Sequence, residues 1–474
     1  MVETSTAEGV ADRAPLGAHL LARLDRLPVI TPHIVWITIL TANVAVEYYD
    51  NVLFAYLTPS IMKDTRLTIG EIGWITTALF IGMGIGGLVG GRLQDRFGRR
   101  QILLYSTVVY SAGAIATGLC SSFELMFIAR VCTGIGVQAA TSAVLVFIAE
   151  MFPSNSRGKF VSIVTVSWVV IGPVVSLLAL YFIPHGGPGA WRILFMASGF
   201  SMILIPLVMF LMPESVRWLV SRGHVEKAEK LVQQLEIRAL RKGPLAQPQI
   251  APAAVQELTL REVLRNRRIL SMLAVIALGW FGANLGNYLT SNYRTFVLSD
   301  ALKFDDTTIY AITLIINLVC IVYPFLAILV VDRMERKFMV LSTSILCAVP
   351  LIGYGIVTSV WAITVTGCIY AVLAGLIPIV YYAYIPEAAP TEARGLGTGF
   401  IFTIGRVGGA LSGVLGAMIY SDLGRGPLMS VAALAYVVPA FVIFVWGPRT
   451  TRRSLEGITA EELEADTAPA GKSS

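Results

Sequence analysis

Charged residues are scarce in this sequence. Asp, Glu, Lys and Arg make up 14% of its 474 residues, whereas about 25% is usual in a soluble domain. Hydrophobic residues make up 55%, and the mean hydropathy is +0.72. A soluble protein this apolar would expose large hydrophobic patches and aggregate. The composition therefore excludes an ordinary soluble domain and favours a membrane protein.

Cysteine and histidine are also rare, which limits redox, metal and proton-transfer chemistry. The five cysteines all lie in apolar stretches and form no Cys-x-x-Cys pair. We therefore expect small core residues rather than disulfides or metal ligands. The four histidines lie at or beyond the ends of the apolar stretches. A proton carried across the membrane would therefore depend on carboxylates.

Motifs of enzymes and of ATP-driven pumps are missing as well. No Walker sequence, nucleophile–base pair or metal-ligand set emerges, so we expect neither an enzyme nor a cofactor. Residues 82–87 fit Gly-x-Gly-x-x-Gly, but they lie in an apolar stretch, where small residues allow close helix packing. The net charge of +6 comes from Arg and Lys that fall mainly between apolar stretches. This pattern is typical of a membrane protein and argues against a nucleic-acid partner.

Twelve apolar stretches are long enough to cross a bilayer, which takes about 20 residues of helix. They predict an all-α membrane protein with transmembrane helices at residues 33–57, 70–92, 101–120, 124–151, 158–183, 191–212, 269–296, 307–331, 338–357, 361–385, 396–420 and 427–447. The polar stretch 213–268 holds eleven Arg and Lys residues, which places it in the cytoplasm. With six helices on each side of it, both termini are expected there too. No cleavable signal peptide is expected, and the predicted location is the bacterial cytoplasmic (inner) membrane.

The predicted regions are a cytoplasmic N-terminal tail, a six-helix bundle, a cytoplasmic linker with amphipathic helices, a second six-helix bundle and a cytoplasmic C-terminal tail. Their boundaries are 1–30, 31–212, 213–268, 269–447 and 448–474. Leucines at helical spacing in the first tail predict a short amphipathic helix at the membrane interface. They are Leu20, Leu21, Leu24 and Leu27.

The two halves of the chain repeat a charge pattern. The interval from Asp95 to Asp332 equals the interval from Glu150 to Glu387, and both are half the chain length. We call this interval the repeat offset. It relates two separate loops of the first half to two loops of the second half. It predicts a duplicated six-helix unit, and parallel repeats are one of the known plans of transporters.

Several motifs resemble the major facilitator superfamily. GRLQDRFGRR at 91–100 matches every fixed position of its signature between helices two and three, G-x-x-x-D-R-x-G-R-R. AEMFPSNSRG at 149–158, WRILF at 191–195 and PESVRWLVSRG at 213–223 resemble its sugar-porter and metabolite-symporter branches. The resemblance covers nearly the whole chain and implies two six-helix bundles around a central cavity.

The seventh predicted helix departs from the sugar porters. WFGANLGNYLTSNYRTF at 280–296 lacks their Gln-rich sugar-binding pattern. RLDRLPVITPHIVW, before the first helix, and GRVGGALSG, in the eleventh, look more like proton-coupled symporters of aromatic and other organic acids. They are also similar to organic-ion carriers, so the resemblance leaves more than one substrate class open.

Two acids lie in the middle of the first predicted helix. A charge at mid-membrane costs about 3 kcal/mol or more, so Glu47 and Asp50 must be paired, wet or protonated. Their i, i+3 spacing puts them on one face, where their titrations can couple as a proton carrier requires. The alternative is an ion pair that serves helix packing. The repeat offset places Asn284 and Asn287 at the equivalent positions, which suggests proton handling in the first half and substrate hydrogen bonding in the second.

The family resemblance implies roles for further charged residues. In the proton-coupled sugar porters, an acid of helix one and an arginine of helix four form the coupling pair. Carried over, Asp50 would accept the proton and Arg130 would hold its ionised form, although a static structural pair is the alternative. The loop residues resemble the superfamily's cytoplasmic charge network, whose ion pairs break when the cavity opens inward; solvated loop charges are the alternative. This predicted cytoplasmic gate comprises Asp95, Arg96, Arg99, Arg100, Glu150, Arg157, Asp332, Arg336, Glu387 and Arg394.

Other candidates concern the substrate. Arg406 lies about 18 Å along a helix from Arg394, at mid-membrane, where it would meet a substrate carboxylate or pair across helices. Arg294 is expected as a rim residue whose guanidinium reaches water. The aromatic residues that would line the cavity, or simply pack in the core, are Tyr49, Trp168, Trp280, Tyr288, Tyr381 and Tyr382.

These patterns predict a monomeric secondary transporter that works by alternating access and uses the proton gradient to import a small organic or aromatic acid. Its expected partners are the substrate, protons and the lipid bilayer. One alternative is an exporter or organic-cation carrier of the same fold, with Glu47 and Asp50 as the cation site. Another is a membrane sensor that binds a ligand without transporting it.

Overall fold

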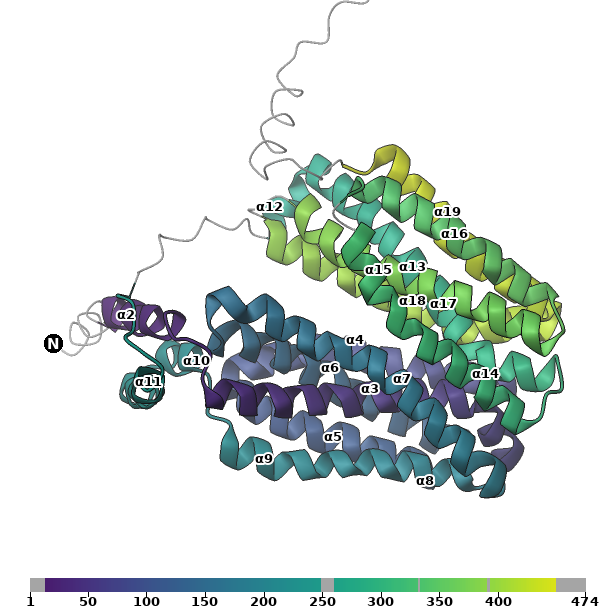
Figure 1. Ribbon diagram of the computed structural model, residues 1–474, viewed down its shortest axis with the longest axis horizontal. Coiled ribbons are helices and arrows are strands. Elements are labelled where there is room, and N and C mark those ends of the chain that lie inside the picture. Colours follow the sequence, from purple (N-terminus) through teal and green to yellow (C-terminus); the bar gives the residue numbers. More distant parts are fainter. Residues whose placement is uncertain (1–12, 249–259, 331–332, 390–392, 449–474) are drawn as a thin grey trace, which may run out of the picture. The chain divides into compact units, whose positions relative to one another are not determined.

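A computed structural model describes residues 13–248, 260–330, 333–389 and 393–448, and these residues form helices without any strand (Figure 1). The helices are α2 (Arg13–Asp25), α3 (Thr31–Thr65), α4 (Ile69–Phe97), α5 (Arg99–Leu119), α6 (Phe123–Met151), α7 (Arg157–His185), α8 (Ala190–Ala197), α9 (Leu204–Leu211), α10 (Val216–Ser221), α11 (Val225–Leu240), α12 (Leu260–Arg265), α13 (Arg267–Asp300), α14 (Asp306–Val319), α15 (Tyr323–Val330), α16 (Arg336–Ile356), α17 (Val360–Ala388), α18 (Arg394–Leu423) and α19 (Arg425–Trp446).

Eleven helical segments in the described part of the chain are long and apolar enough to cross a membrane. The one predicted span that is not among these eleven is the first, which corresponds to α3. This helix has 35 residues but is less apolar, because it carries Glu47 and Asp50 within it and Lys63 and Asp64 near its end. The helical fold confirms the prediction of an all-α membrane protein. The buried acids that make the first span a candidate site also lower its hydropathy.

Two predicted spans are not continuous α-helices. A 3₁₀ segment, Ser198–Ile203, separates α8 from α9, and another, Cys320–Val322, separates α14 from α15. Hydropathy does not reveal such breaks, because each span as a whole is apolar enough to cross a membrane. A 3₁₀ stretch inside a helix tightens the backbone locally and re-aims the side chains that follow.

Polar residues next to the apolar stretches set several helix starts. A side-chain oxygen of the residue before each helix accepts a hydrogen bond from a backbone N–H of its first turn, which would otherwise lack an acceptor. Such N-caps precede α6, α10, α13, α14 and α17, and they are Ser122, Ser215, Asn266, Asp305 and Ser359.

Residues of the described chain group into two compact units. Unit 1 draws on Met1–Leu53, Ile81–Ile171 and Ala190–Ala254, and unit 2 on Phe54–Phe80, Gly172–Gly189 and Val255–Ser474. Helices α3, α4 and α7 contribute residues to both. The division into five regions with two six-helix bundles stays a prediction.

Glycine lets helices approach closely within each unit. In unit 1, α5 packs on α6, and a Cβ at Gly136 would lie 2.6 Å from the backbone nitrogen of Tyr110. In unit 2, α13 packs on α18 and α19, and a Cβ at Gly282 would clash with the carbonyl oxygen of Ala435. The lack of a side chain at these positions brings helix backbones together, as is common in membrane proteins.

The N-terminal helix α2 packs on protein. Its Leu20 and Leu24, with Leu27 just after it, are almost fully buried, and α2 contacts α10 and α11 within unit 1. Arg23 donates two hydrogen bonds to the carboxylate of Glu236 on α11, at 3.1 and 2.5 Å, and Arg26 donates a third at 2.6 Å. These leucines therefore pack on protein, and the location of α2 at the membrane interface stays a prediction.

Glu236→Gln should loosen α2 from α11. Burial raises the pKa of Glu236, but the hydrogen bonds and charges of Arg23 and Arg26 outweigh it and leave the pKa below its usual value. A lowered carboxylate pKa stabilises the docked state above the pKa of the undocked carboxylate, and this stability is lost as pH falls through the lowered value. We expect hydrogen exchange in α2 to become about tenfold faster in the variant at pH 7, which matches the loss of one charge-assisted hydrogen bond.

The matched control for this prediction is Glu226→Gln, because Glu226 is an exposed acid in the first turn of the same helix. Wild-type protein should approach the exchange rate of the Glu236 variant only below about pH 4.5, the usual range of the carboxylate. Equal protection of α2 in wild type and Glu236→Gln would contradict the role of this clamp.

Candidate functional site

A buried ion pair joins the middle of α3 to the N-terminal third of α6 in unit 1. Nη1 of Arg130 donates a hydrogen bond to Oδ2 of Asp50 at 2.7 Å, and the two side chains are 1% and 0% exposed. The other carboxylate oxygen, Oδ1, is buried and has no hydrogen-bond partner among the described residues. The structure thus brings together the two residues that the family resemblance paired, and it leaves one oxygen of Asp50 able to take up a proton.

The neighbours of this pair come from the same unit. Glu47 lies one turn before Asp50 on α3. Its Oε1 accepts a hydrogen bond from the hydroxyl of Thr141 at 2.5 Å. The guanidinium of Arg130 lies 5.7 Å from the ring centre of Phe195. Tyr49 donates its hydroxyl to the carbonyl of Leu194 at 3.0 Å, so this predicted cavity residue is anchored in the packed interior of unit 1.

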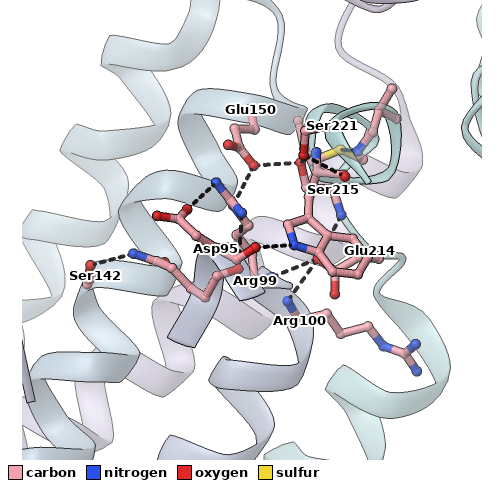
Figure 2. Close-up of polar contacts among 12 residues, drawn as sticks. Asp95, Arg99, Arg100, Ser142, Glu150, Glu214, Ser215 and Ser221 are labelled. Carbon is pink, nitrogen blue, oxygen red and sulfur yellow. Dashed lines mark hydrogen bonds and ion pairs between the residues drawn. The ribbon is translucent and has the colours of Figure 1, made fainter. Parts of the chain in front are cut away.

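A second cluster lies where α4 ends and α5 begins (Figure 2). Nε of Arg99 lies 2.9 Å from Oε2 of Glu150 at the end of α6, and Nη2 lies 3.1 Å from Oδ1 of Asp95. The Asp95 carboxylate is 73% exposed, whereas Arg99 and Glu150 are mostly covered. The Arg99–Glu150 pair is therefore the better shielded contact of this cluster.

Glu214 is a member of this cluster that the prediction of site residues missed. Its Oε1 accepts hydrogen bonds from the backbone N–H groups of Arg99, Arg100 and Ser215, at 2.8, 3.2 and 2.9 Å (Figure 2). It thereby satisfies the first turn of α5, where a negative charge is favourable. Burial raises the pKa of Glu214 above its usual value, although these backbone donors and Arg99 act against it. The signal was present, because Glu214 belongs to the family-like motif PESVRWLVSRG.

Gly98→Ala should destabilise this cluster. Gly98 has φ 100° and ψ 159°, which is costly for any other residue, and a Cβ there would clash with Oε2 of Glu214. We expect the free energy of unfolding to fall by about 1–3 kcal/mol, measured on the purified protein in detergent. Gly158→Ala is the control, because a Cβ at Gly158 meets no atom within 4 Å. An unchanged stability of Gly98→Ala would show that Glu214 does not cap α5 in solution.

The second half repeats the shielded pair of the first. Nε and Nη2 of Arg336 donate to the two oxygens of Glu387 at 3.2 and 3.1 Å. The repeat offset carries Arg99 onto Arg336 and Glu150 onto Glu387. The same ion pair therefore forms at equivalent positions of both repeats, in unit 1 and in unit 2.

The remaining residues of the predicted gate lie elsewhere or are not described. Arg96 is exposed and lies over the ring of Phe97. Arg100 donates to the carbonyls of Val208 and Met209. Arg157 pairs with Asp25, the last residue of α2, which the sequence did not predict. Asp332 and the side chain of Arg394 lie outside the described residues.

A small cavity opens between α13, α17 and α19 in unit 2. Its volume is about 20 Å³, which is room for about one water molecule, and it is lined by Trp280, Ala283, Asn284, Asn287, Ala374, Ile377, Pro378 and Tyr436. Nδ2 of Asn284 donates to the carbonyl of Trp280 at 2.7 Å. The amide of Asn287 makes no hydrogen bond to another described residue, so both its donors and its acceptor are available to a ligand. Three predicted substrate residues, Trp280, Asn284 and Asn287, thus line one cavity.

Aromatic rings pack around Trp280, which lines this cavity. The ring centre of Trp280 lies 5.2 Å from that of Tyr381, 5.6 Å from that of Tyr382 and 5.8 Å from that of Phe402. The half-buried Arg406 of α18 interacts electrostatically with Tyr382. The ring centre of Tyr288 lies 4.7 Å from that of Phe80, and Tyr288 also interacts electrostatically with Tyr382. Trp168 belongs to unit 1, where its ring centre lies 6.2 Å from that of Tyr48.

The cavity and the buried pair occupy equivalent positions of the repeat. The repeat offset carries Glu47, Asp50 and Thr141 onto Asn284, Asn287 and Pro378. In unit 1 these positions hold a hydrogen-bonded acid and an ion pair, whereas in unit 2 they line a small cavity with neutral amides. Because amides carry no charge, they can bind a polar ligand without a counter-ion.

Comparison with known proteins identifies the family. The family described as "Sugar (and other) transporter" matches residues 29–461. The chain belongs to this transporter family. It is therefore a multi-pass membrane transporter of the major facilitator superfamily and not an enzyme, as the sequence predicted.

Curated relatives of the family include transporters with different substrates. The niacin transporter NiaP of Acinetobacter baylyi is 26% identical over 93% of this chain and 99% of its own length. The cis,cis-muconate transport protein of the same organism is 26% identical over 84% of this chain and 91% of its own. The inner membrane metabolite transport protein YdjE of Escherichia coli is also 26% identical, over 92% and 98%.

Solved structures in the family share the fold. The xylose transporter XylE of E. coli, in an inward-open conformation, has a TM-score of 0.70 at 19% identity and covers 90% of this chain and 98% of its own. A D-xylose–proton symporter has a TM-score of 0.71 at 17% identity, with 89% and 99% covered. These likenesses confirm the predicted fold of twelve transmembrane helices in two repeats.

Proposed function

We propose that this transporter imports a small organic acid, with an aromatic acid as the preferred substrate, by proton symport and alternating access. The observation that carries the proposal is the division between the repeats. One carries the buried Asp50–Arg130 pair, and the other carries an amide-lined cavity at the equivalent positions. Both termini would lie in the cytoplasm, and the transporter would work as a monomer.

The Asp50–Arg130 pair supports proton coupling. A fully buried carboxylate is stable as an anion only while Arg130 neutralises it. When Asp50 takes up a proton it loses that attraction and releases the guanidinium, which changes the preference between two conformations. The D-xylose–proton symporter with the same fold uses protons according to its name, and this chain holds an acid and an arginine where such coupling can occur.

The cavity supports an aromatic or unsaturated acid as substrate. Trp280 and its neighbouring rings offer flat apolar faces, and the amides of Asn284 and Asn287 can hydrogen-bond a carboxylate or a ring nitrogen. Sugar recognition would need more polar groups than this lining provides. Niacin and cis,cis-muconate, the substrates named for two relatives, are both unsaturated carboxylates.

The proposal can be tested in proteoliposomes. Labelled nicotinate, benzoate, cis,cis-muconate and xylose would be offered with and without an inward proton gradient, while external pH is recorded. We expect a carboxylate to accumulate with the gradient and to alkalinise the external medium. Accumulation of xylose alone, or of a carboxylate without any proton movement, would contradict the proposal.

Asn287→Ala tests the cavity itself. Because Asn287 makes no hydrogen bond within the described part of the chain, its loss should weaken substrate binding more than it weakens the fold. We expect the KM for the transported carboxylate to rise about tenfold, as for the loss of one or two hydrogen bonds. Asn292→Ala is the matched control, since Asn292 lies on the same helix and bonds Ser412 instead. Equal KM values in the two variants would remove Asn287 from the site.

Two alternatives make different predictions. An exporter or organic-cation carrier would bind labelled amines at Glu47 and Asp50, and protons would then move against the substrate. A sensor would bind a ligand without moving it across the bilayer. Alkalinisation of the external medium during substrate uptake separates symport from both alternatives.

A further inference from the structure

Arg294 is a buried cation near the C-terminal end of α13. Its side chain is 7% exposed, so the expectation of a rim residue with its guanidinium in water was wrong. A charge inside a membrane protein needs a partner or water. The contacts of Arg294 therefore show whether an acidic partner is present.

Neutral groups from several helices surround the guanidinium. Nη2 donates a hydrogen bond to Oδ1 of Asn317 on α14, at 3.5 Å, and Nε is buried without an acceptor in the described chain. The ring centre of Tyr56 on α3 lies 5.4 Å from the guanidinium carbon. The titratable groups that act on it are the phenols of Tyr56 and Tyr354 and the thiol of Cys320. None of these groups is a carboxylate.

Other buried arginines of this chain have an acid at hand. Arg130 meets Asp50 at 2.7 Å, and Arg336 meets Glu387 at 3.1 Å. Burial of a guanidinium is normally compensated in this way, since five N–H donors and a full charge are removed from water. Arg294 is buried in the same way, but no acid pairs with it among the residues that the structure describes. An anion that binds from outside the protein would neutralise the buried guanidinium and accept its hydrogen bonds.

The position of Arg294 relates it to the cavity. Trp280, Asn287 and Arg294 follow one another at intervals of seven residues on α13. Seven residues fall within about 20° of two full turns, so the three lie on one face of the helix, and Arg294 is about 10 Å further along than Asn287. A ligand that moves along this face passes from Arg294 to the amides of the cavity.

The cover of Arg294 consists of neutral hydrogen bonds. Nδ2 of Asn317 donates to the hydroxyl of Ser176 on α7 at 2.5 Å and to the hydroxyl of Tyr56 at 2.9 Å. Each of these bonds can be exchanged for one to water, so their loss costs little compared with the breaking of a buried ion pair. The guanidinium can therefore be uncovered without the separation of opposite charges.

We propose that Arg294 is a carboxylate-binding site on the substrate path, distinct from the cavity, which captures the anionic group of the substrate when Tyr56 and Asn317 move off it. The site rests on the proposed function, because its ligand is the organic acid that the protein transports. The planar guanidinium binds a carboxylate through two parallel hydrogen bonds, and an uncharged analogue loses both the charge and this geometry. Arg294 thus selects for acids before the cavity selects for shape.

Transport kinetics in proteoliposomes test the site with matched probes. Uptake of nicotinate and of its neutral amide, nicotinamide, would be measured for wild type, Arg294→Met and Arg294→Lys. We expect the KM for nicotinate to rise about tenfold or more in Arg294→Met. The rise should be smaller in Arg294→Lys, which keeps the charge but not the two parallel N–H donors of the guanidinium. The maximal rate and any nicotinamide uptake should change by less than about twofold. Benzoate and benzamide provide a second acid–amide pair.

The control is Lys303→Met. Lys303 is an exposed cation just beyond α13 that pairs with Asp300, so its replacement removes the same charge from the same end of the helix without touching the site. An unchanged KM for both acids in Arg294→Met, or an equal rise in Lys303→Met, would overturn the inference and leave the proposed function standing. Failure of wild type to transport any carboxylate would overturn both.

A measurement on wild-type protein covers the case in which Arg294→Met does not fold. Phenylglyoxal modifies accessible arginines, and peptide mass spectrometry would read its addition to Arg294 in proteoliposomes. We expect modification in the absence of substrate, slowed severalfold by nicotinate and unaffected by nicotinamide. An Arg294 that is never modified, or is modified equally with both compounds, would contradict a carboxylate site there.

Discussion

Asp50→Asn should abolish proton-driven accumulation of the substrate while leaving exchange of substrate across the bilayer. The amide keeps the shape of the side chain and can still accept a hydrogen bond from Arg130, but it cannot take up a proton at physiological pH. Without a titrating group, the conformational change would no longer be linked to the gradient. We expect net uptake against a concentration gradient to fall to background, a loss of about a hundredfold or more.

The measurement is a pair of assays on the same proteoliposomes. Proton-driven uptake should be lost in Asp50→Asn, whereas counterflow of labelled against unlabelled substrate should stay within about threefold of wild type. Asp422→Asn is the matched control, because Asp422 is an exposed acid at the end of α18. An Asp50→Asn protein that still concentrates its substrate would remove Asp50 from the coupling mechanism.

Arg130→Met should strongly destabilise the protein. Asp50 is 0% exposed, so loss of its partner leaves a buried carboxylate that must stay charged without compensation or become protonated. Breaking a buried ion pair in this way typically costs about 3–5 kcal/mol. The free energy of unfolding, measured in detergent by denaturant titration, should fall by this amount at neutral pH and by less at acidic pH, where protonation of Asp50 relieves the buried charge.

The double variant Asp50→Asn/Arg130→Met separates the ion pair from simple packing. It carries neither charge, so most of the lost stability should return, because the cost of one buried, unpaired charge is removed. If the double variant is as unstable as the sum of the two single variants, the side chains contribute independently. The electrostatic account of the pair would then be wrong.

Particular residues show how far the sequence could predict the candidate site. A carboxylate in the middle of an apolar helix indicates a partner, and the family motifs named Arg130 for Asp50; the structure places them 2.7 Å apart. The repeat offset predicted equivalent loops, and the structure contains the same ion pair in both, Arg99–Glu150 and Arg336–Glu387. These predictions succeeded because charge in an apolar segment and periodic duplication are both legible along the chain.

Other features of the structure could not be predicted from patterns along the sequence. Nothing in the spacing of Leu20, Leu24 and Leu27 says whether lipid or another helix covers them, and the structure shows that protein does. The capping of α5 by Glu214 joins segments that are far apart in the sequence. The cavity beside Asn287 exists because α13, α17 and α19 leave space there.

By itself, the sequence determined that this protein is a twelve-helix membrane transporter built from two repeats, with acids in one half where the other has amides. Length, hydropathy, charge and duplication are properties of the chain and are sufficient for the helices and the repeats, while the resemblance of its motifs to the major facilitator superfamily implies the transporter. Only the tertiary structure decided which other polar groups have partners among the described residues: Glu47 has Thr141, Asn287 lines a pocket, and Arg294 lies buried among neutral groups without an acid. Partnership depends on which helix faces are brought together, and one helix does not encode the face of its neighbour.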